Sequence, residues 1–165
     1  DCDMIPLGHL SIRGERGKDR LSRLSKDEQY TLMTFWTIFR SPLMFGGDLP
    51  TIDPFTLSLL TNDEVLKMHS ESTDVTLLFQ NADQSAIVSR NENTGEVYLA
   101  LFNLSKEQRT VSATVDQIKA AMPALGKKWN AKTLTDMWHG NSLKKSGKTI
   151  SQSLAPHASI LIKIK

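Results

Sequence analysis

The sequence predicts a chain in two parts, an α/β segment over residues 1–72 and an all-β domain over residues 73–165. Hydrophobic residues make up 39% of the 165 residues, which is enough to build a core and excludes wholesale disorder. In the first part, a long apolar helical pattern is followed by a short apolar run that suits a buried parallel strand. In the second part, short β-rich runs separated by polar turns favour an antiparallel sandwich.

The first helix is expected over residues 26–39. Ser25 and Glu28 have the spacing of a capping box, in which the serine hydroxyl accepts the N–H of Glu28 and the glutamate reaches back. This helix is apolar nearly all round, so we expect it to be buried on most sides. The apolar run at 43–45 follows it as the expected strand, and shorter helices are expected from Asp53 onward.

The second part alternates between short strands and turns. Its last run is the clearest, because Ile160, Ile162 and Ile164 fall on one face of a strand and Leu161 falls on the other. Residues 117–125 are expected as a helical insertion. The expected strands cover 74–80, 85–90, 96–102, 109–115, 133–138, 148–154 and 159–164.

The apolar run at 43–45 cannot form a sheet by itself, because the backbone of a buried parallel strand needs neighbours on both sides. Either the missing strands precede Asp1 in a longer protein, or residues 1–72 wrap onto the β domain. The acidic start Asp1-Cys2-Asp3-Met4 favours the first explanation, since a natural N-terminus usually begins with a variable lead-in.

Composition excludes several classes of partner and site. Lys and Arg number 20 and Asp and Glu number 18, so the net charge is 20 − 18 = +2, and we expect neither nucleic acid nor a membrane as partner. The single Cys2 excludes an internal disulfide and a four-thiolate zinc site. The four histidines lack metal-ligand spacing, so we expect no metal and no cofactor.

A series of short motifs is spread over nearly the whole chain in a characteristic order. The motifs are Asp1-Cys2-Asp3-Met4, Gly8, Glu28-Gln29, Trp36, Ser41-Pro42-Leu43, Gly47-Asp48-Leu49, Leu60-Thr61-Asn62, Asp136-Met137-Trp138-His139-Gly140, Leu154 and Pro156-His157. Their order and spacing resemble the C-terminal part of clan-D glycoside hydrolases. The most similar family is that of the α-galactosidases and α-N-acetylgalactosaminidases, glycoside hydrolase family 27.

The resemblance implies a fold and a site. It implies that residues 1–72 are the last part of a (β/α)8 TIM barrel, which takes about 250 residues when complete, and that an antiparallel β-sandwich follows. It also implies that Asp3 lines a sugar pocket, with Met4 in the pocket wall and Asp1 beside it. From the residues alone, the alternative is that Asp1 and Asp3 merely cap the next loop. Members of the family usually have proline at the position of Cys2. The backbone at Asp3 is therefore less constrained in this chain.

The implied activity is that of a retaining glycosidase acting on terminal α-galactosides. Such enzymes need two carboxylates about 5–5.5 Å apart. The family's two catalytic aspartates lie upstream of Asp1, so we expect no catalytic residue in this chain and no activity from it alone. The expected partners are an α-galactoside-containing carbohydrate and the missing N-terminal barrel portion, in a secreted or periplasmic setting. The alternative is a non-catalytic carbohydrate-binding or structural sandwich module.

Two further features have both a functional and a structural interpretation. The Arg-rich loop 13–23 suits an acidic substrate or partner, or else a solvated loop held by ion pairs to Glu15 and Asp19. Trp129 and Trp138 suit a sugar-stacking platform or the core of the sandwich.

Overall fold

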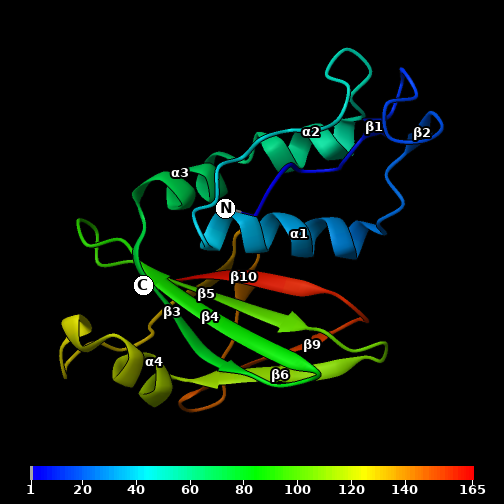
Figure 1. The fold of residues 1–165 in the computed structure, drawn as a ribbon. Coiled ribbons are helices and arrows are strands. Elements are labelled where there is room, and N and C mark those ends of the chain that lie inside the picture. The colour runs from blue at the N-terminus through cyan, green and yellow to red at the C-terminus, as the bar shows by residue number, and fades with distance from the viewer. Residues whose placement is uncertain (1) are drawn as a thin grey trace.

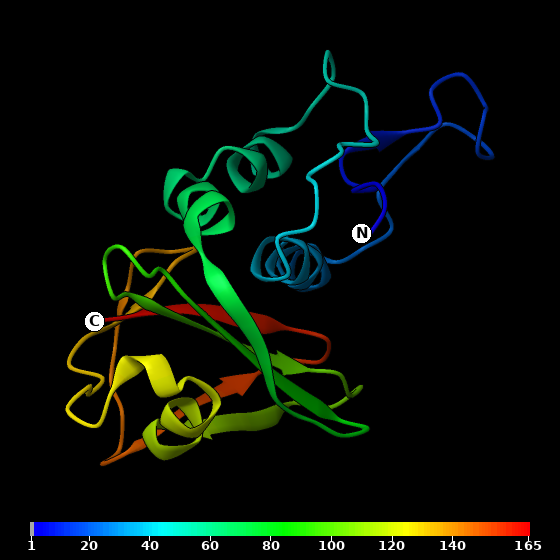
Figure 2. The ribbon, with the colours of Figure 1, turned by 60° about the vertical axis from the view of Figure 1, so that its left-hand side comes forward.

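The structure is a computed structural model that describes residues 2–165, and these residues form three stacked layers (Figure 1). The first layer holds helices α1 (Lys26–Ile38), α2 (Pro54–Leu60) and α3 (Asp63–Glu71). A six-stranded sheet forms the second layer and a two-stranded sheet forms the third. The turned view shows α1 lying along the larger sheet, with α2 and α3 on the same side (Figure 2).

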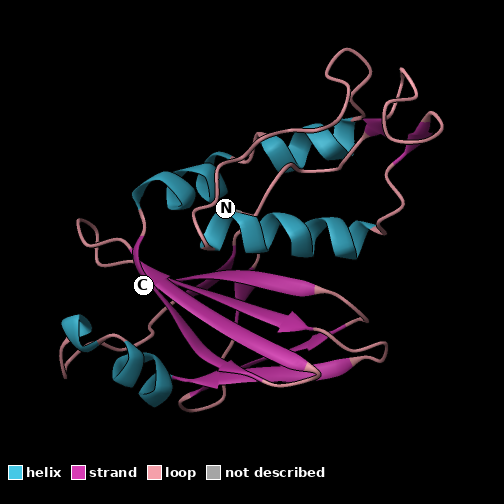
Figure 3. Cartoon of the chain, in the orientation of Figure 1, coloured by secondary structure: helices cyan, strands magenta, loops and turns pink. Residues whose placement is uncertain are grey.

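The two sheets are antiparallel and face each other (Figure 3). The larger sheet has the strand order β3-β4-β5-β10-β7-β8, and β6 pairs with β9 in the smaller one. The predicted antiparallel sandwich is therefore confirmed. The strands are β3 (Thr73–Gln80), β4 (Gln84–Arg90), β5 (Val97–Asn103), β6 (Arg109–Thr114), β7 (Leu134–Asp136), β8 (Ser142–Leu143), β9 (Thr149–Leu154) and β10 (Ser159–Ile164).

The helical insertion is also present, as α4 (Val115–Ala121) and a short 3₁₀ helix, η1 (Pro123–Leu125). Strand β8 has no counterpart among the expected strands. The loop after residue 8 contains one short ladder, in which β1 (His9–Leu10) pairs with β2 (Arg20–Leu21).

Alternation along the strands divides the apolar side chains between two cores. On β10, Ile160, Ile162 and Ile164 face the smaller sheet, as expected, whereas Leu161 faces the helices. Every residue of β5 is buried, because this strand has the smaller sheet on one face and α1 on the other. The larger sheet is therefore the middle layer of the molecule.

Helix α1 is covered on both of its long faces, as its all-round apolar pattern predicts. Its N-terminus carries the predicted capping box, with the Glu28 amide 3.3 Å from the Ser25 hydroxyl and the Ser25 amide 2.8 Å from the Glu28 carboxylate. On one face, the Phe35 ring stacks on Phe102 of β5 at a centroid distance of 3.8 Å. On the other face, Met33 joins the cluster built around Ile5. Helix α1 therefore packs directly against the larger sheet.

The run at 43–45 differs from expectation. It forms no regular strand in the described chain, and Phe45 makes a single parallel bridge to Ile5. Met44 is 57% exposed, so the expectation of a strand buried on both faces is wrong here. The physical reason is that, among residues 2–165, one neighbouring segment lies beside this run, and its other edge and one face are left uncovered.

Asn103, at the end of β5, fastens the turn between the two sheets. Its side chain is fully buried, and its Nδ2 lies 2.7, 3.1 and 2.8 Å from the carbonyl oxygens of Glu107, Leu154 and Ala155. Its Oδ1 accepts from the amide and the hydroxyl of Ser105. One amide group therefore satisfies several buried polar atoms at once.

We predict that Asn103→Ala lowers the free energy of unfolding by about 2–4 kcal/mol, because the buried carbonyls lose their donor. Urea denaturation measures this change. Asn141→Ala, at an exposed position in the β7–β8 turn, is the control and should change stability by less than about 0.5 kcal/mol. A loss at Asn103 no larger than that of the control would contradict the assignment.

Candidate substrate-contact site

Two extended segments, 2–7 and 41–48, lie side by side above α1. The Ile5 amide donates to the Met44 carbonyl at 2.8 Å, and the Gly46 amide donates to the Ile5 carbonyl at 3.0 Å, so the segments run parallel. Ile5 is fully buried in the cluster that includes residues of α1. The helical layer therefore fixes the position of both segments.

Asp3 has an unusual backbone that is fixed on both sides. Its φ is +64°, a left-handed conformation that Asp tolerates better than most residues. The Trp36 indole N–H donates to the Asp3 carbonyl at 2.9 Å, and the Met4 amide donates to the Asp3 carboxylate at 2.7 Å. The Cys2 amide donates to the Ser41 hydroxyl at 2.8 Å. These bonds hold the segment in place although it lacks the proline common in the resembling family.

Asp3 and Met4 are both exposed, and Met4 keeps 51% of its surface. This geometry suits contact with a ligand. Asp1, the third residue of the expected site, lies outside the described residues.

Gly46 and Gly47 bring the second segment very close to the first. A Cβ added at Gly47 would lie 2.3 Å from the Leu7 carbonyl oxygen and 2.6 Å from the Phe45 ring. At Gly46 it would lie 3.3 Å from the Ile5 carbonyl oxygen and 3.4 Å from the Met4 Cβ. Only glycine fits at position 47 without a shift of the backbone. Met4 lies next to Gly46.

A hollow of about 440 Å³ opens beside these glycines. Its volume lies within the range of about 300–1,000 Å³ common for small-ligand sites. Its wall combines polar and apolar surface in about equal parts, and the polar side chains could bond to the hydroxyl groups of a ligand. It is lined by His9, Ser11, Ile12, Arg13, Glu15, Gly46, Gly47 and Asp48.

A chain of polar contacts stiffens one side of the hollow. The His9 ring forms an ion pair with Asp19 through Nε2, and its Nδ1 lies 2.9 Å from the Thr51 hydroxyl. The Thr51 hydroxyl donates to the Asp48 carboxylate at 2.6 Å, and the Asp48 amide donates to the His9 carbonyl at 2.8 Å. These contacts connect the loop that begins at β1 with the loop that follows Gly47.

Ser11 stands out in the wall of the hollow. Ser11 is only 6% exposed and has a φ of +58°. Its hydroxyl group bonds to no atom within residues 2–165. A buried hydroxyl without a partner costs free energy, so such positions commonly serve a ligand or a bound water. Sequence reasoning missed both Ser11 and His9, whose signals are single polar residues in a loop. It noted the Gly47-Asp48 pair only as part of a motif.

The Arg-rich loop 13–23 is not organised by the expected ion pairs. Asp19 pairs with His9, and within the described chain no arginine of this loop forms a side-chain ion pair with Glu15 or Asp19. Arg20 instead donates to the backbone carbonyls of Arg16 and Lys18. The expectation of arginine–carboxylate pairing is wrong because backbone carbonyls of the tight loop are nearer acceptors.

The two tryptophans of the expected platform lie in different places. The Trp138 indole N–H donates to the Thr34 hydroxyl of α1 at 2.9 Å, and its ring packs in both helix-side clusters, which supports the core interpretation. Trp129 packs partly on the sandwich core and lines a separate hollow. Asp136 caps the turn beyond β7 by accepting from the Trp138 amide at 2.9 Å and from the His139 ring at 2.8 Å.

No group of three or more His, Cys, Asp or Glu residues within 2–165 is placed to hold a metal ion. Among the helices of this described range, none has the length and apolar character that a membrane span requires.

Comparison with known proteins identifies the β domain. The family of alpha-galactosidase C-terminal β-sandwich domains matches residues 82–164. The chain belongs to this family, and it corresponds to the C-terminal domain of family 27 enzymes of the α-galactosidase type.

Individual relatives agree with this assignment and extend it to the helical layer. A family 27 β-L-arabinopyranosidase from Geobacillus stearothermophilus is 38% identical, with a TM-score of 0.89 over 100% of this chain and 36% of its own. An α-galactosidase of Oryza sativa is 26% identical over 95% of this chain and 33% of its own length. The α-galactosidase I of Mortierella vinacea shares the fold at 22% identity, with a TM-score of 0.76 over 98% of this chain and 38% of its own. The chain thus spans about a third of these relatives.

We predict that Gly47→Ala destabilises the protein by about 1–3 kcal/mol, because the new methyl group would force the Leu7 backbone and the Phe45 ring apart. Thermal unfolding measures the loss. Gly46→Ala is a matched control with a much looser fit, so its loss should be clearly smaller. Equal losses for the two variants would show that close approach of the segments is not the constraint.

Proposed function

We propose that this chain is the C-terminal portion of a retaining glycoside hydrolase that cleaves terminal α-galactosides. In this proposal, residues 1–72 are the last part of a (β/α)8 barrel and residues 73–165 are the sandwich that braces it. The observation that carries the proposal is the parallel pairing of Ile5 with Phe45, since parallel neighbours joined through a helix are the unit of such a barrel. The match to a family 27 enzyme at 38% identity, which covers 100% of this chain and 36% of the enzyme, supports the proposal.

The uncovered apolar groups beside this pairing support the barrel as well. Met44 and Leu49 are 57% and 65% exposed, and Phe39 at the end of α1 is 49% exposed. Large apolar groups clustered on one side of a domain commonly mark a surface that another part of a protein covers. The proposed occupant is the N-terminal portion of the same barrel.

Asp3 and Met4 are the proposed contacts with the sugar. A carboxylate accepts charge-assisted hydrogen bonds from sugar hydroxyls, and a methionine offers a soft apolar surface to a sugar ring. Trp36 and the Met4 amide would hold Asp3 in position through the bonds described above. Asp1 is proposed as a third contact on the strength of the resemblance.

The chemical step is proposed to occur on two carboxylates in the part of the protein that precedes Asp1. One would attack the anomeric carbon, and the other would protonate the leaving oxygen and then activate water. The described residues would contribute binding and orientation only, so the chain on its own should not hydrolyse glycosides.

A β-L-arabinopyranoside is the second candidate substrate, because one relative is a β-L-arabinopyranosidase. This sugar has the ring configuration of an α-D-galactopyranoside and lacks only the exocyclic CH2OH group. The same hydroxyl contacts from Asp3 would therefore serve either substrate, and the two are compared in the test below.

We predict that Asp3→Ala in the full gene product lowers kcat/KM for p-nitrophenyl α-galactoside by about tenfold or more, since a charge-assisted hydrogen bond contributes at least about 1.5 kcal/mol. The same assay with p-nitrophenyl β-L-arabinopyranoside identifies the preferred sugar. Asp116→Ala, an exposed position on α4 that pairs with Lys148, is the control and should leave kcat/KM unchanged.

Undiminished kcat/KM in Asp3→Ala would overturn the proposed contact while leaving the enzyme assignment intact. Absence of hydrolysis of both substrates by the full gene product would overturn the enzyme assignment and favour the non-catalytic module.

A further inference from the structure

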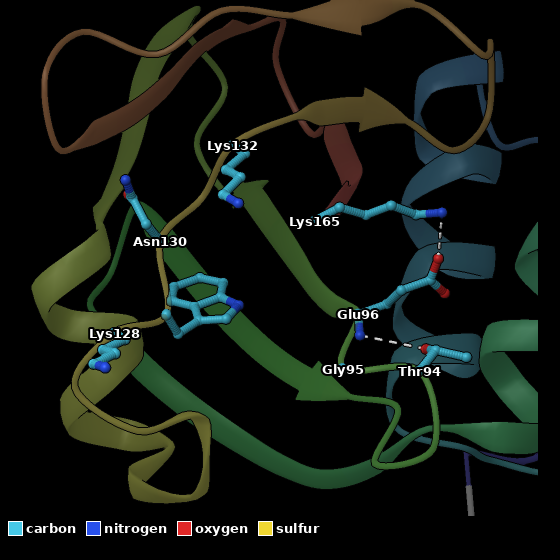
Figure 4. A pocket seen from close by; sticks show the side chains of 8 residues that line it. Thr94, Gly95, Glu96, Lys128, Asn130, Lys132 and Lys165 are labelled. Carbon is cyan, nitrogen blue, oxygen red and sulfur yellow. Dashed lines mark hydrogen bonds and ion pairs between the residues drawn. The ribbon is translucent and has the colours of Figure 1, made fainter.

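A second hollow lies at one end of the sandwich and shares no lining residue with the hollow beside Gly47. Its volume is about 510 Å³, again in the range of about 300–1,000 Å³ for small-ligand sites. Figure 4 shows that its walls come from three separate segments: the turn between β4 and β5, the loop between η1 and β7, and the chain end after β10. The lining residues are Thr94, Gly95, Glu96, Lys128, Trp129, Asn130, Lys132 and Lys165.

Backbone hydrogen bonds join two of the three segments, and a side-chain bond shapes the third. The Lys132 amide donates to the carbonyl of Lys165 at 2.7 Å, and the Thr133 amide donates to the same oxygen at 3.0 Å. On the other wall, the Glu96 amide donates to the Thr94 hydroxyl at 3.3 Å. The hollow is therefore part of the framework of the sandwich.

The charge in this hollow is strongly biased toward cations. The lining contains three lysines and one carboxylate, Glu96. Glu96 accepts from Lys165 at 2.7 Å (Figure 4). It also accepts from the Tyr98 hydroxyl at 3.0 Å. Lys128 and Lys132 are exposed and form no ion pair with any residue of the described range 2–165.

Glu96 and Lys165 are both charged at neutral pH. Burial works against the Glu96 carboxylate, but the hydrogen bonds from Lys165 and Tyr98 outweigh it and lower the pKa of Glu96. The hydrogen bond and the charge of Glu96 raise the pKa of Lys165. The pair thus compensates itself, and Lys128 and Lys132 leave an uncompensated charge of about two units for a ligand.

The remaining lining groups select the kind of anion. Trp129 is half-buried and packs on the sandwich core, so its ring is held in place and presents a rigid apolar surface. Asn130 can both donate and accept, and Thr94 adds a hydroxyl. A small inorganic anion would use the lysines alone, whereas a sugar acid would also use the aromatic surface and the amide.

From these observations we infer that the hollow binds an oligosaccharide that carries uronic acid residues. Trp129 would contact the C–H face of one sugar ring, and Lys128 and Lys132 would meet carboxylates of the oligosaccharide. Asn130 would bond to ring hydroxyls. Such a site would hold the protein on acidic polysaccharide at a place separate from the proposed galactoside contacts. The choice of a sugar as ligand rests on the proposed function.

The test is a calorimetric titration of the full gene product with trigalacturonate, at low and high salt. We expect saturable binding that weakens as salt rises, because lysine–carboxylate contacts are screened. The double variant Lys128→Glu/Lys132→Glu should weaken binding by about tenfold or more, which corresponds to about 1.4 kcal/mol. Lys106→Glu, an exposed position beyond the opposite end of β5, is the matched control and should change affinity less than about twofold.

Trp129→Leu separates a sugar site from a general anion site. It keeps an apolar side chain against the core, and it should abolish the ligand-induced change in tryptophan fluorescence and weaken binding of trigalacturonate. Binding of inorganic sulfate as tight as that of trigalacturonate, with no effect of Trp129→Leu, would overturn the inference. If neutral β-1,4-galactotriose bound as tightly as trigalacturonate, the inference that the ligand carries uronic acid residues would be overturned.

The inference and the proposed function fail in different ways. Binding of trigalacturonate that depends on Trp129 and the two lysines would stand even if neither chromogenic glycoside were hydrolysed. Hydrolysis without such binding would leave the proposed function standing and overturn the inference.

Discussion

The structure depends on the packing of α1 between two partners that are distant in sequence. Phe35 stacks on Phe102 in the middle sheet, with ring centroids 3.8 Å apart, and Met33 packs against Ile5 on the opposite side. A helix that is apolar nearly all round can be stable only with such double cover. Because α1 contributes to the cluster on the larger sheet and to the cluster around Ile5, the segment that carries Asp3 takes its position from the sandwich.

This constraint explains why the candidate site is well defined even though its residues are exposed. Trp36 projects from α1 to hold the Asp3 backbone, and Gly47 lets the neighbouring segment approach the Leu7 carbonyl. The sandwich thus acts as a brace for the proposed sugar contacts. Its other end carries the cationic hollow around Trp129, so a single rigid domain would present two binding regions.

Local rules predicted much of the fold. The capping box at Ser25, the alternation in β10 and the change from helix to strand near residue 72 depend on neighbours in sequence, and local chemistry was sufficient for them. The parallel pairing of Phe45 with Ile5 and the cover on α1 depend on contacts between distant segments, so the sequence left alternatives open. The candidate site was harder to predict than the fold. Ser11 and His9 line the hollow only because two loops that are distant in sequence lie side by side.

Helix α1 joins the segment at residues 2–7 and the sandwich into one cooperative unit. Native-state hydrogen exchange, followed by mass spectrometry at increasing denaturant, is the most direct test of this coupling. Amides of α1 and of β5 should exchange through the same global opening, with equal free energies of opening. Exchange of α1 and residues 2–7 at low denaturant, while β5 stays fully protected, would contradict it.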